Sequence, residues 1–260
     1  MSYETILYEV RERVAEIRLN RPQRLNAVTQ ELYDELNAAL SAAEADRDVH
    51  VLLLTGEGRA FCVGADLKAH KAGRTAYDRR QYLNGEQAVC KRLIQLKKPV
   101  VAAVNGFALG AGAEMAIASD FILMAESAQL GLPEISLGTF LGGGVTWLLP
   151  RLVGLAKARE LVFLGERIGG AEAVRIGLAN RVLADEGFID GARAFAATLA
   201  TKAPFSMQLA KEQLNMAAER TLDAALVAEL EGMTFASTTR DWQEGVDAFA
   251  EKRAPVFRGE

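Results

Sequence analysis

A segment rich in glycine and alanine at positions 106–114 constrains the fold of this 260-residue chain most strongly. It follows the continuous apolar stretch Val100–Val104, which predicts a strand buried on both faces. A second turn rich in small residues, at 61–67, follows another predicted buried strand at 49–54. Glycine and alanine let the backbone approach a ligand closely and point its amides there. The two turns therefore predict an α/β core in which the backbone packs closely just after each of these strands. A helix is expected to begin near Gly110 or Ala111.

Apolar periodicity predicts further elements along the chain. Alternation over residues 4–20, interrupted by Arg11-Glu12-Arg13, indicates a hairpin. Thr29 is placed to cap a helix. The apolar positions of that helix recur at helical spacing: Leu32, Leu36, Ala39, Leu40 and Ala43. Short strands are expected at 121–124 and 129–132, and another helix after residues 142–144. From about residue 185 the pattern is almost wholly helical, over 187–201, 204–219, 221–236 and 241–252.

Composition excludes several classes of protein. Half of the residues are hydrophobic and a quarter are charged, as in ordinary globular proteins, and the net charge of −4 offers no basic surface for nucleic acid. The two cysteines, Cys62 and Cys90, indicate reduced thiols rather than a disulfide framework. Neither a signal peptide nor an apolar run of about 20 residues is visible. These features lead us to expect a cytoplasmic protein.

Common catalytic motifs are also missing. The only histidines are His50, at the start of a predicted strand, and His70, in a polar stretch. This scarcity disfavours histidine-rich zinc sites and the usual serine triads. The patterns Gly-x-Ser-x-Gly, Gly-x-Gly-x-x-Gly and the phosphate-binding Gly-x-x-x-x-Gly-Lys are absent. Hydride transfer and nucleotide hydrolysis therefore have no support here.

The two small-residue turns suggest a different chemistry. If Ala111 begins a helix, its amide is an unpaired donor at the positive end of the helix dipole. Two such amides converging on a carbonyl oxygen would form an oxyanion hole. Tight packing of helix against sheet is the simpler interpretation for either turn alone. The acidic residues nearby, Glu114 and Glu134, favour the functional interpretation for the pair, although exposed surface positions are the ordinary place for glutamate.

Five segments of the chain together resemble the crotonase, or enoyl-CoA hydratase/isomerase, family. Residues 60–68, Ala-Phe-Cys-Val-Gly-Ala-Asp-Leu-Lys, are similar to its oxyanion segment, and residues 98–114 to its Lys-Pro…Gly-Gly-Gly-x-Glu motif. Residues 130–138 resemble its second acidic motif, residues 248–253 its C-terminal signature, and residues 21–27 its Arg-Pro…Leu-Asn-Ala motif. These matches span nearly the whole chain.

The resemblance implies an architecture and a substrate class. It implies an α/β spiral core of ββα units over residues 1–195, followed by a helical C-terminal region over 196–260 that builds homotrimers, often paired as homohexamers. The substrate would be an acyl-CoA thioester. No metal or redox cofactor is implied, because coenzyme A is part of the substrate, and neither nucleic acid nor a membrane is an expected partner.

Matching positions carry the implied roles. The amides of Ala65 and Ala111 would form the oxyanion hole, Glu114 and Glu134 would be the catalytic acids, and the amide of Gly142 would support the water. Ala111 stands where glycine is usual, which alanine tolerates unless its φ is positive. The positions implied to contact coenzyme A are Leu25, Ala27, Ala65, Asp66, Leu67 and Lys68, with Phe249 and Lys252 supplied by a neighbouring subunit. An exposed lysine, and an ordinary amphipathic helix surface, remain the alternatives for Lys68 and for the C-terminal pair.

Paired glutamates 20 residues apart favour hydration of a 2-enoyl-CoA to a 3-hydroxyacyl-CoA among the activities of the family. The alternatives are an enoyl-CoA isomerase that uses one glutamate, a dehydratase of a functionalised acyl-CoA, and a non-catalytic protein that binds acyl-CoA or RNA. One segment departs from the hydratase pattern. Residues 138–148 keep Gly142 but carry Phe140, Leu141 and Trp147, which are bulkier than the residues usual there. The sequence therefore does not predict which acyl group the substrate carries.

Overall fold

A six-stranded sheet forms the larger layer of the protein, in a computed structural model that describes residues 3–66 and 75–260. Its strand order is β1-β2-β3-β5-β7-β10, and only β1 and β2 are antiparallel neighbours. The bounds are β1 Ile6–Arg11, β2 Val14–Leu19, β3 Val51–Gly56, β5 Val100–Val104, β7 Phe121–Ala125 and β10 Arg181–Leu183. The hairpin predicted at Arg11-Glu12-Arg13 is confirmed, with positive φ at Glu12 and Arg13 in the turn.

A smaller sheet lies beside the first and carries the strand ends next to the candidate site. Its order is β4-β6-β8-β9, with β4, β6 and β8 parallel. The bounds are β4 Ala60–Cys62, β6 Phe107–Leu109, β8 Gln129–Gly131 and β9 Ile168–Gly169. Because β4, β6 and β8 run the same way, the turns that follow them meet at one edge of this sheet.

The chain alternates between the two sheets in repeated ββα units. Strand β3 enters the large sheet, β4 the small sheet, and α2 (Ala76–Gln95) follows. The same sequence repeats as β5, β6 and α3 (Ala111–Ile117), and again as β7, β8 and, after a short 3-10 turn η2 (Ile135–Leu137), α4 (Val145–Val153). The predicted crotonase-type α/β architecture is therefore confirmed.

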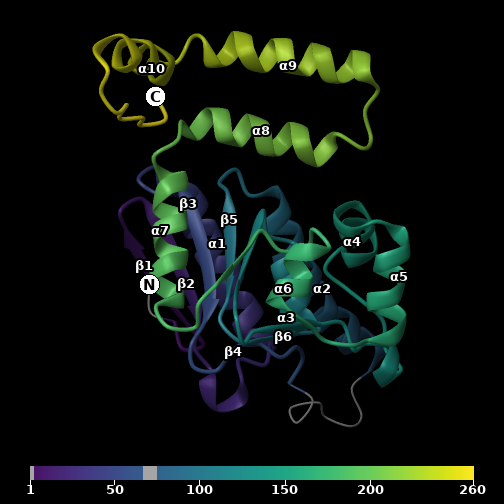
Figure 1. Cartoon of the computed structure of the whole chain (residues 1–260). Coiled ribbons are helices and arrows are strands. Elements are labelled where there is room, and N and C mark those ends of the chain that lie inside the picture. Colours follow the sequence, from purple (N-terminus) through teal and green to yellow (C-terminus); the bar gives the residue numbers. More distant parts are fainter. Residues whose placement is uncertain (1–2, 67–74) are drawn as a thin grey trace.

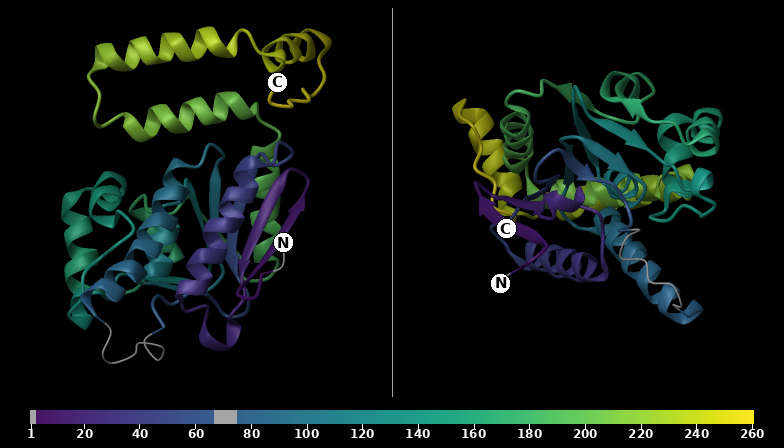
Figure 2. Two further views of the ribbon diagram at one scale, coloured as in Figure 1. Left: turned by 180° about the vertical axis from the view of Figure 1, so that it is seen from behind. Right: turned by 90° about the horizontal axis from the view of Figure 1, so that it is seen from below.

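Helices pack against the sheets (Figures 1 and 2). Helix α1 (Gln30–Ala45) begins at Thr29, whose Oγ accepts a hydrogen bond from the amide of Leu32 at 3.3 Å, as predicted. It packs against α2, a helix that was not predicted from the sequence. The remaining short elements are η1 Pro22–Arg24, α5 Leu155–Leu164 and α6 Gly170–Arg175.

Four helices end the chain, close to the predicted ranges. Helix α7 (Phe188–Ala200) packs on the large sheet, and His50 Nδ1 donates a hydrogen bond to the carbonyl oxygen of Ala200, the last residue of this helix, at 3.1 Å. Helices α8 (Pro204–Met216), α9 (Leu222–Ala236) and α10 (Arg240–Glu251) then lie beyond the sheets (Figure 1). An ion pair from the buried Lys211 Nζ to Asp120 Oδ2 at 2.7 Å ties α8 to the core. Within the described ranges, no helix combines the length and apolarity needed to cross a bilayer.

Candidate active site

Two backbone turns meet at the edge of the small sheet, one after β4 and one after β6. Gly64 lies in the first turn with φ +88°. A Cβ built on Gly64 would lie 3.0 Å from the carbonyl oxygen of Leu109 and 3.5 Å from the amide nitrogen of Ala111. Glycine is thus required both for the backbone conformation and for the close approach. The turns that the sequence singled out are in van der Waals contact.

Among the residues that the structure describes, the amides of Ala65 and Ala111 donate neither to a neighbouring strand nor within a helix. Ala65 pairs with Val28 in an isolated bridge, whose hydrogen bonds run from Val28 N to the carbonyl of Gly64 and from Asp66 N to the carbonyl of Val28. Ala111 is the first residue of α3, so its amide has no partner within the helix. Ala111 is not among the residues with positive φ, so alanine is accommodated in place of glycine.

Glu114 points into the protein from the first turn of α3 and is only 1% exposed. Its Oε1 accepts a hydrogen bond from the amide of Gly142 at 2.7 Å. Its Oε2 is buried without a hydrogen-bond partner. The Gly142 amide, predicted to support a water molecule, therefore holds the carboxyl of Glu114 in this state.

Glu134 approaches the same place from the loop after β8. It precedes η2, is 7% exposed, and its Oε2 has no hydrogen-bond partner. A Cβ built on Gly110 would lie 3.0 Å from Glu134 Oε1, which puts this carboxyl beside the turn that begins α3. Both predicted acids are buried, in contrast to the solvated surface positions usual for glutamate.

A third carboxyl, which the sequence analysis did not identify, joins the pair from α2. Glu86 is half-buried, and its Oε2 accepts a hydrogen bond from the Tyr33 hydroxyl at 3.2 Å. A Cβ built on Gly142 would overlap Glu86 Oε1 and lie 3.2 Å from Glu114 Oε2. The carboxyls of Glu86 and Glu114 therefore face the same glycine.

Burial and mutual repulsion shift the ionisation of these acids. Desolvation is the main cause that raises the pKa of Glu114 far above its usual range, and the neighbouring carboxyl of Glu86 raises it further. The amide of Gly142 opposes this shift by stabilising the carboxylate. Desolvation also raises the pKa of Glu134. Such shifts keep a carboxyl able to hold a proton near neutral pH, which acid–base chemistry requires.

The predicted contacts for coenzyme A are distributed unevenly. Leu25 and Ala27 lie in the loop beside the β4 turn, where Val63 N donates to the Leu25 carbonyl at 3.2 Å and Arg21 donates to the Ala27 carbonyl. Asp66 accepts from Arg21 Nη2 at 3.1 Å. The predictions for Leu67 and Lys68 lie outside the described residues. Phe249, 87% exposed, lies on α10, and the exposed Lys252 follows it directly; α10 lies apart from α3, the helix that carries Glu114 (Figure 1).

The divergent loop after Glu134 places its large side chains differently. Phe140 is exposed, whereas Leu141 is buried in the core. Trp147, on α4, is covered by the guanidinium of Arg151 at 4.0 Å from the ring centroid. Phe140 is thus the most exposed of the three large side chains of this segment.

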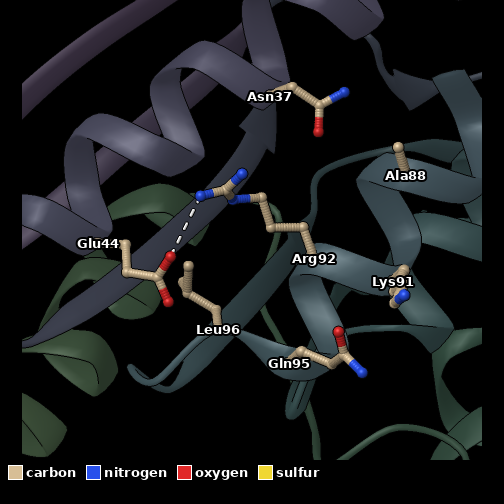
Figure 3. A pocket seen from close by; sticks show the side chains of 7 residues that line it. All are labelled: Asn37, Glu44, Ala88, Lys91, Arg92, Gln95 and Leu96. Carbon is tan, nitrogen blue, oxygen red and sulfur yellow. Dashed lines mark hydrogen bonds and ion pairs between the residues drawn. The ribbon is translucent and has the colours of Figure 1, made fainter.

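Two of the molecule's cavities lie away from the acids. One, of about 400 Å³, opens between α1 and α2, where Arg92 Nη2 and Glu44 Oε2 pair at 3.2 Å (Figure 3). Another, of about 590 Å³, lies near Arg18, Asp185 and Arg193. Neither is lined by Glu114 or Glu134. Within the part of the chain that the structure describes, no cluster of side chains could hold a metal ion.

Two mixed sheets built from ββα units, with buried glutamates beside the turns at one edge of the smaller sheet, define a crotonase-fold protein. The family model for enoyl-CoA hydratase/isomerase matches residues 9–260. The chain belongs to this family, as the sequence motifs indicated.

Individual relatives cover the chain from end to end. A probable enoyl-CoA hydratase of Rhizobium meliloti is 41% identical over 258 residues, covering 99% of each chain. The 1,2-epoxyphenylacetyl-CoA isomerase of Escherichia coli is 38% identical over 259 residues, covering 98% of this chain and 99% of its own. The crystal structure of an enoyl-CoA hydratase from Bacillus anthracis superposes with a TM-score of 0.95 at 36% identity, covering 99% of this chain and all of that one.

Proposed function

We propose that this protein hydrates a 2-enoyl-CoA thioester to a 3-hydroxyacyl-CoA, reversibly. The observation that carries the proposal is the convergence of two buried glutamates, Glu114 and Glu134, beside the turns that hold the amides of Ala65 and Ala111. The hydratase names of several relatives support the same reaction class. The E. coli relative bears an isomerase name, so isomerisation is the second candidate.

Hydration requires one proton to leave water and one to arrive at C2 of the acyl group. In our proposal Glu114 holds the water and accepts its proton while the water oxygen bonds to C3. Glu134 delivers a proton to C2. The amides of Ala65 and Ala111 stabilise the negative charge that develops on the thioester oxygen, a contribution worth about 3–4 kcal/mol per donor in comparable sites.

We also propose that the working protein is a homotrimer or homohexamer. Helix α9 buries none of its residues within the chain, and the side chains of Leu222, Leu230 and Met233 are 74%, 62% and 71% exposed. An apolar helix of this kind is typical of a surface that another subunit covers. Such packing would bring Phe249 and Lys252 of one subunit towards coenzyme A bound by its neighbour.

Crotonyl-CoA hydration by the wild type, Glu114→Gln and Glu134→Gln tests the reaction and the two acids. We expect each substitution to lower kcat by about 10²- to 10⁴-fold, the usual contribution of a positioned acid or base. Glu126→Gln is a matched control, because Glu126 is an exposed glutamate in the turn after β7. The hydratase proposal is wrong if the wild type hydrates no enoyl-CoA in a panel of varied chain length. The two-acid mechanism is wrong if either variant keeps the wild-type rate.

The isomerase candidate has a separate signature. A one-acid isomerase would move the double bond of a 3-enoyl-CoA to the 2-position, and only one of the two glutamine variants would lose that activity. Comparing both substrates with all three proteins therefore distinguishes the candidates.

A further inference from the structure

Glu86 is the polar group at the site that the hydration mechanism leaves unused. Hydration needs two acids, yet α2 brings a third carboxyl to the same glycine, Gly142. Helix α2 buries few of its residues: Val89, Cys90 and Leu93. The position of Glu86 is therefore not explained by burial of the helix as a whole. We infer that its carboxyl lies beside Glu114 for a functional reason.

The carboxyls of Glu86 and Glu114 lie next to the same glycine, and each accepts a hydrogen bond. The hydroxyl of Tyr33 donates to Glu86 Oε2 at 3.2 Å, and the amide of Gly142 donates to Glu114 Oε1 at 2.7 Å. Glu86 Oε1 and Glu114 Oε2 both lie next to Gly142, where a side chain would otherwise stand. Glu114 Oε2 is buried and accepts no hydrogen bond from the residues that the structure describes. Two ionised carboxylates have no hydrogen to share, whereas a single proton between them would satisfy both oxygens.

We propose that Glu86 is a positioning residue that shares one proton with Glu114 and so sets the pH range in which Glu114 can accept a proton from water. The inference rests on the proposed hydration, in which Glu114 must be ionised before it can act on water. While the proton stays on the pair, Glu114 is held neutral. Loss of that proton to solvent, to which half-buried Glu86 is the more open of the two, frees Glu114 as a base.

The surroundings favour sharing over separate ionisation. Several titratable groups interact with the pair from the neighbouring elements: Tyr33 on α1, Cys90 on α2, Cys62 on β4 and Glu134 after β8. Each of these is neutral or negative, so none of them stabilises a second negative charge on the pair. Desolvation and the Glu86 carboxyl both raise the pKa of Glu114, in agreement with a retained proton.

The pH dependence of kcat/KM for enoyl-CoA hydration tests the inference in Glu86→Gln. Glutamine has the same shape but adds no charge, and its amide can donate to the ionised Glu114. We expect the acidic limb of the profile to move to lower pH by about one unit or more, a change of about tenfold in relative rate on that limb. Glu86→Asp keeps the charge and should leave the limb closer to the wild type. Glu31→Gln, which removes an exposed carboxyl from α1, should leave it unchanged.

A merely structural role for Glu86 would change KM, kcat or thermal stability without moving the limb. An acidic limb that stays in place in a folded Glu86→Gln variant would overturn the inference. If Glu86→Gln does not fold, the same comparison is made with Glu86→Asp alone, whose limb should then move by less than one unit but measurably.

A measurement without substrate separates this inference from the proposed function. Infrared difference spectra recorded between neutral and alkaline pH report the C=O stretch of a protonated carboxyl. We expect that band in the wild type at neutral pH, its loss in Glu114→Gln, and in Glu86→Gln its disappearance at a lower pH than in the wild type. A wild type that hydrates nothing but shows the band would refute only the hydration. A wild type that hydrates enoyl-CoA but lacks the band would refute only the shared proton.

Discussion

Gly142→Ala would insert a methyl group between the carboxyls of Glu86 and Glu114, and we expect it to impair catalysis more than folding. Gly142 is not among the glycines with positive φ, so its backbone conformation is open to alanine. The new Cβ, however, would overlap Glu86 Oε1 and lie 3.2 Å from Glu114 Oε2. Either the carboxyls or the loop must move, and the hydrogen bond from Gly142 N to Glu114 Oε1 at 2.7 Å moves with them.

The size of the effect follows from that bond. Hydrogen bonds to charged groups contribute about 1.5–3 kcal/mol. At about 1.36 kcal/mol per factor of ten, loss of the bond in the transition state lowers kcat by roughly 10- to 150-fold. The stability loss should stay near the lower end of the roughly 1–3 kcal/mol that overpacking costs, because the carboxyl of Glu86 is half-buried and can yield.

Steady-state hydration kinetics and thermal melts, measured together, test this prediction. Gly169→Ala is a suitable control, since Gly169 has φ −82° and no atom lies within 4 Å of its added Cβ. We expect the control to keep kcat. A Gly142→Ala variant that keeps kcat within about twofold, or about 0.4 kcal/mol, would refute the argument that this glycine holds Glu114.

Three further predictions concern stability and reactivity. Because folding raises the pKa of Glu114, the folded state binds a proton more tightly than the unfolded state, and this group lowers stability progressively as pH rises above its unfolded value of 4.5. Glu114→Gln should therefore melt at a higher temperature than the wild type at pH 8 and at a similar one near pH 4, as differential scanning calorimetry would show. Asn26 is fully buried with positive φ, and its amide donates to the carbonyls of Ala60 at 2.8 Å and Glu57 at 3.0 Å. Asn26→Ala should cost about 2–4 kcal/mol of unfolding free energy in urea titrations, since it removes the donor to the buried Ala60 carbonyl and to the part-buried Glu57 carbonyl, and a cost under about 0.5 kcal/mol would contradict this. Burial raises the pKa of the Cys62 thiol to about 12, so iodoacetamide should modify it at pH 8 only after denaturation, and rapid labelling of native protein would contradict its placement.

Local chemistry explains which elements could be predicted from the sequence. The first hairpin follows from alternation around a turn, the helix after Thr29 from a cap and apolar spacing, and the C-terminal helices from sustained 3.6-residue periodicity. Each of these signals lies within the element itself. The assignment of Glu114 and Glu134 as acids came from the family motifs, and their roles in catalysis remain predictions. The structure adds that both carboxyls are buried.

Helix α2 and its glutamate could not be found in the same way. Only Val89, Cys90 and Leu93 of this helix are buried, so its apolar periodicity is weak, although Thr75 and Asp78 form a capping box at its start. That box is the one local signal that could have revealed the helix. Glu86 meets Glu114 only because α2 packs against α1 and α3 in the folded chain. No spacing along the sequence encodes that contact.

The stacking of ββα units explains why the functional groups come together and why the site is costly. Parallel pairing of β4, β6 and β8 places the turns that follow these strands, and hence Ala65, Ala111 and Glu134, at one edge of the small sheet. Backbone hydrogen bonds of the two sheets fix this edge, so the side chains of the site need not hold one another in place. The sheets can therefore carry buried carboxyls whose repulsion opposes folding. Substitutions that relieve the repulsion between these acids should therefore raise stability and lower activity. The pH at which Glu114→Gln becomes more stable than the wild type measures this conflict between stability and activity directly.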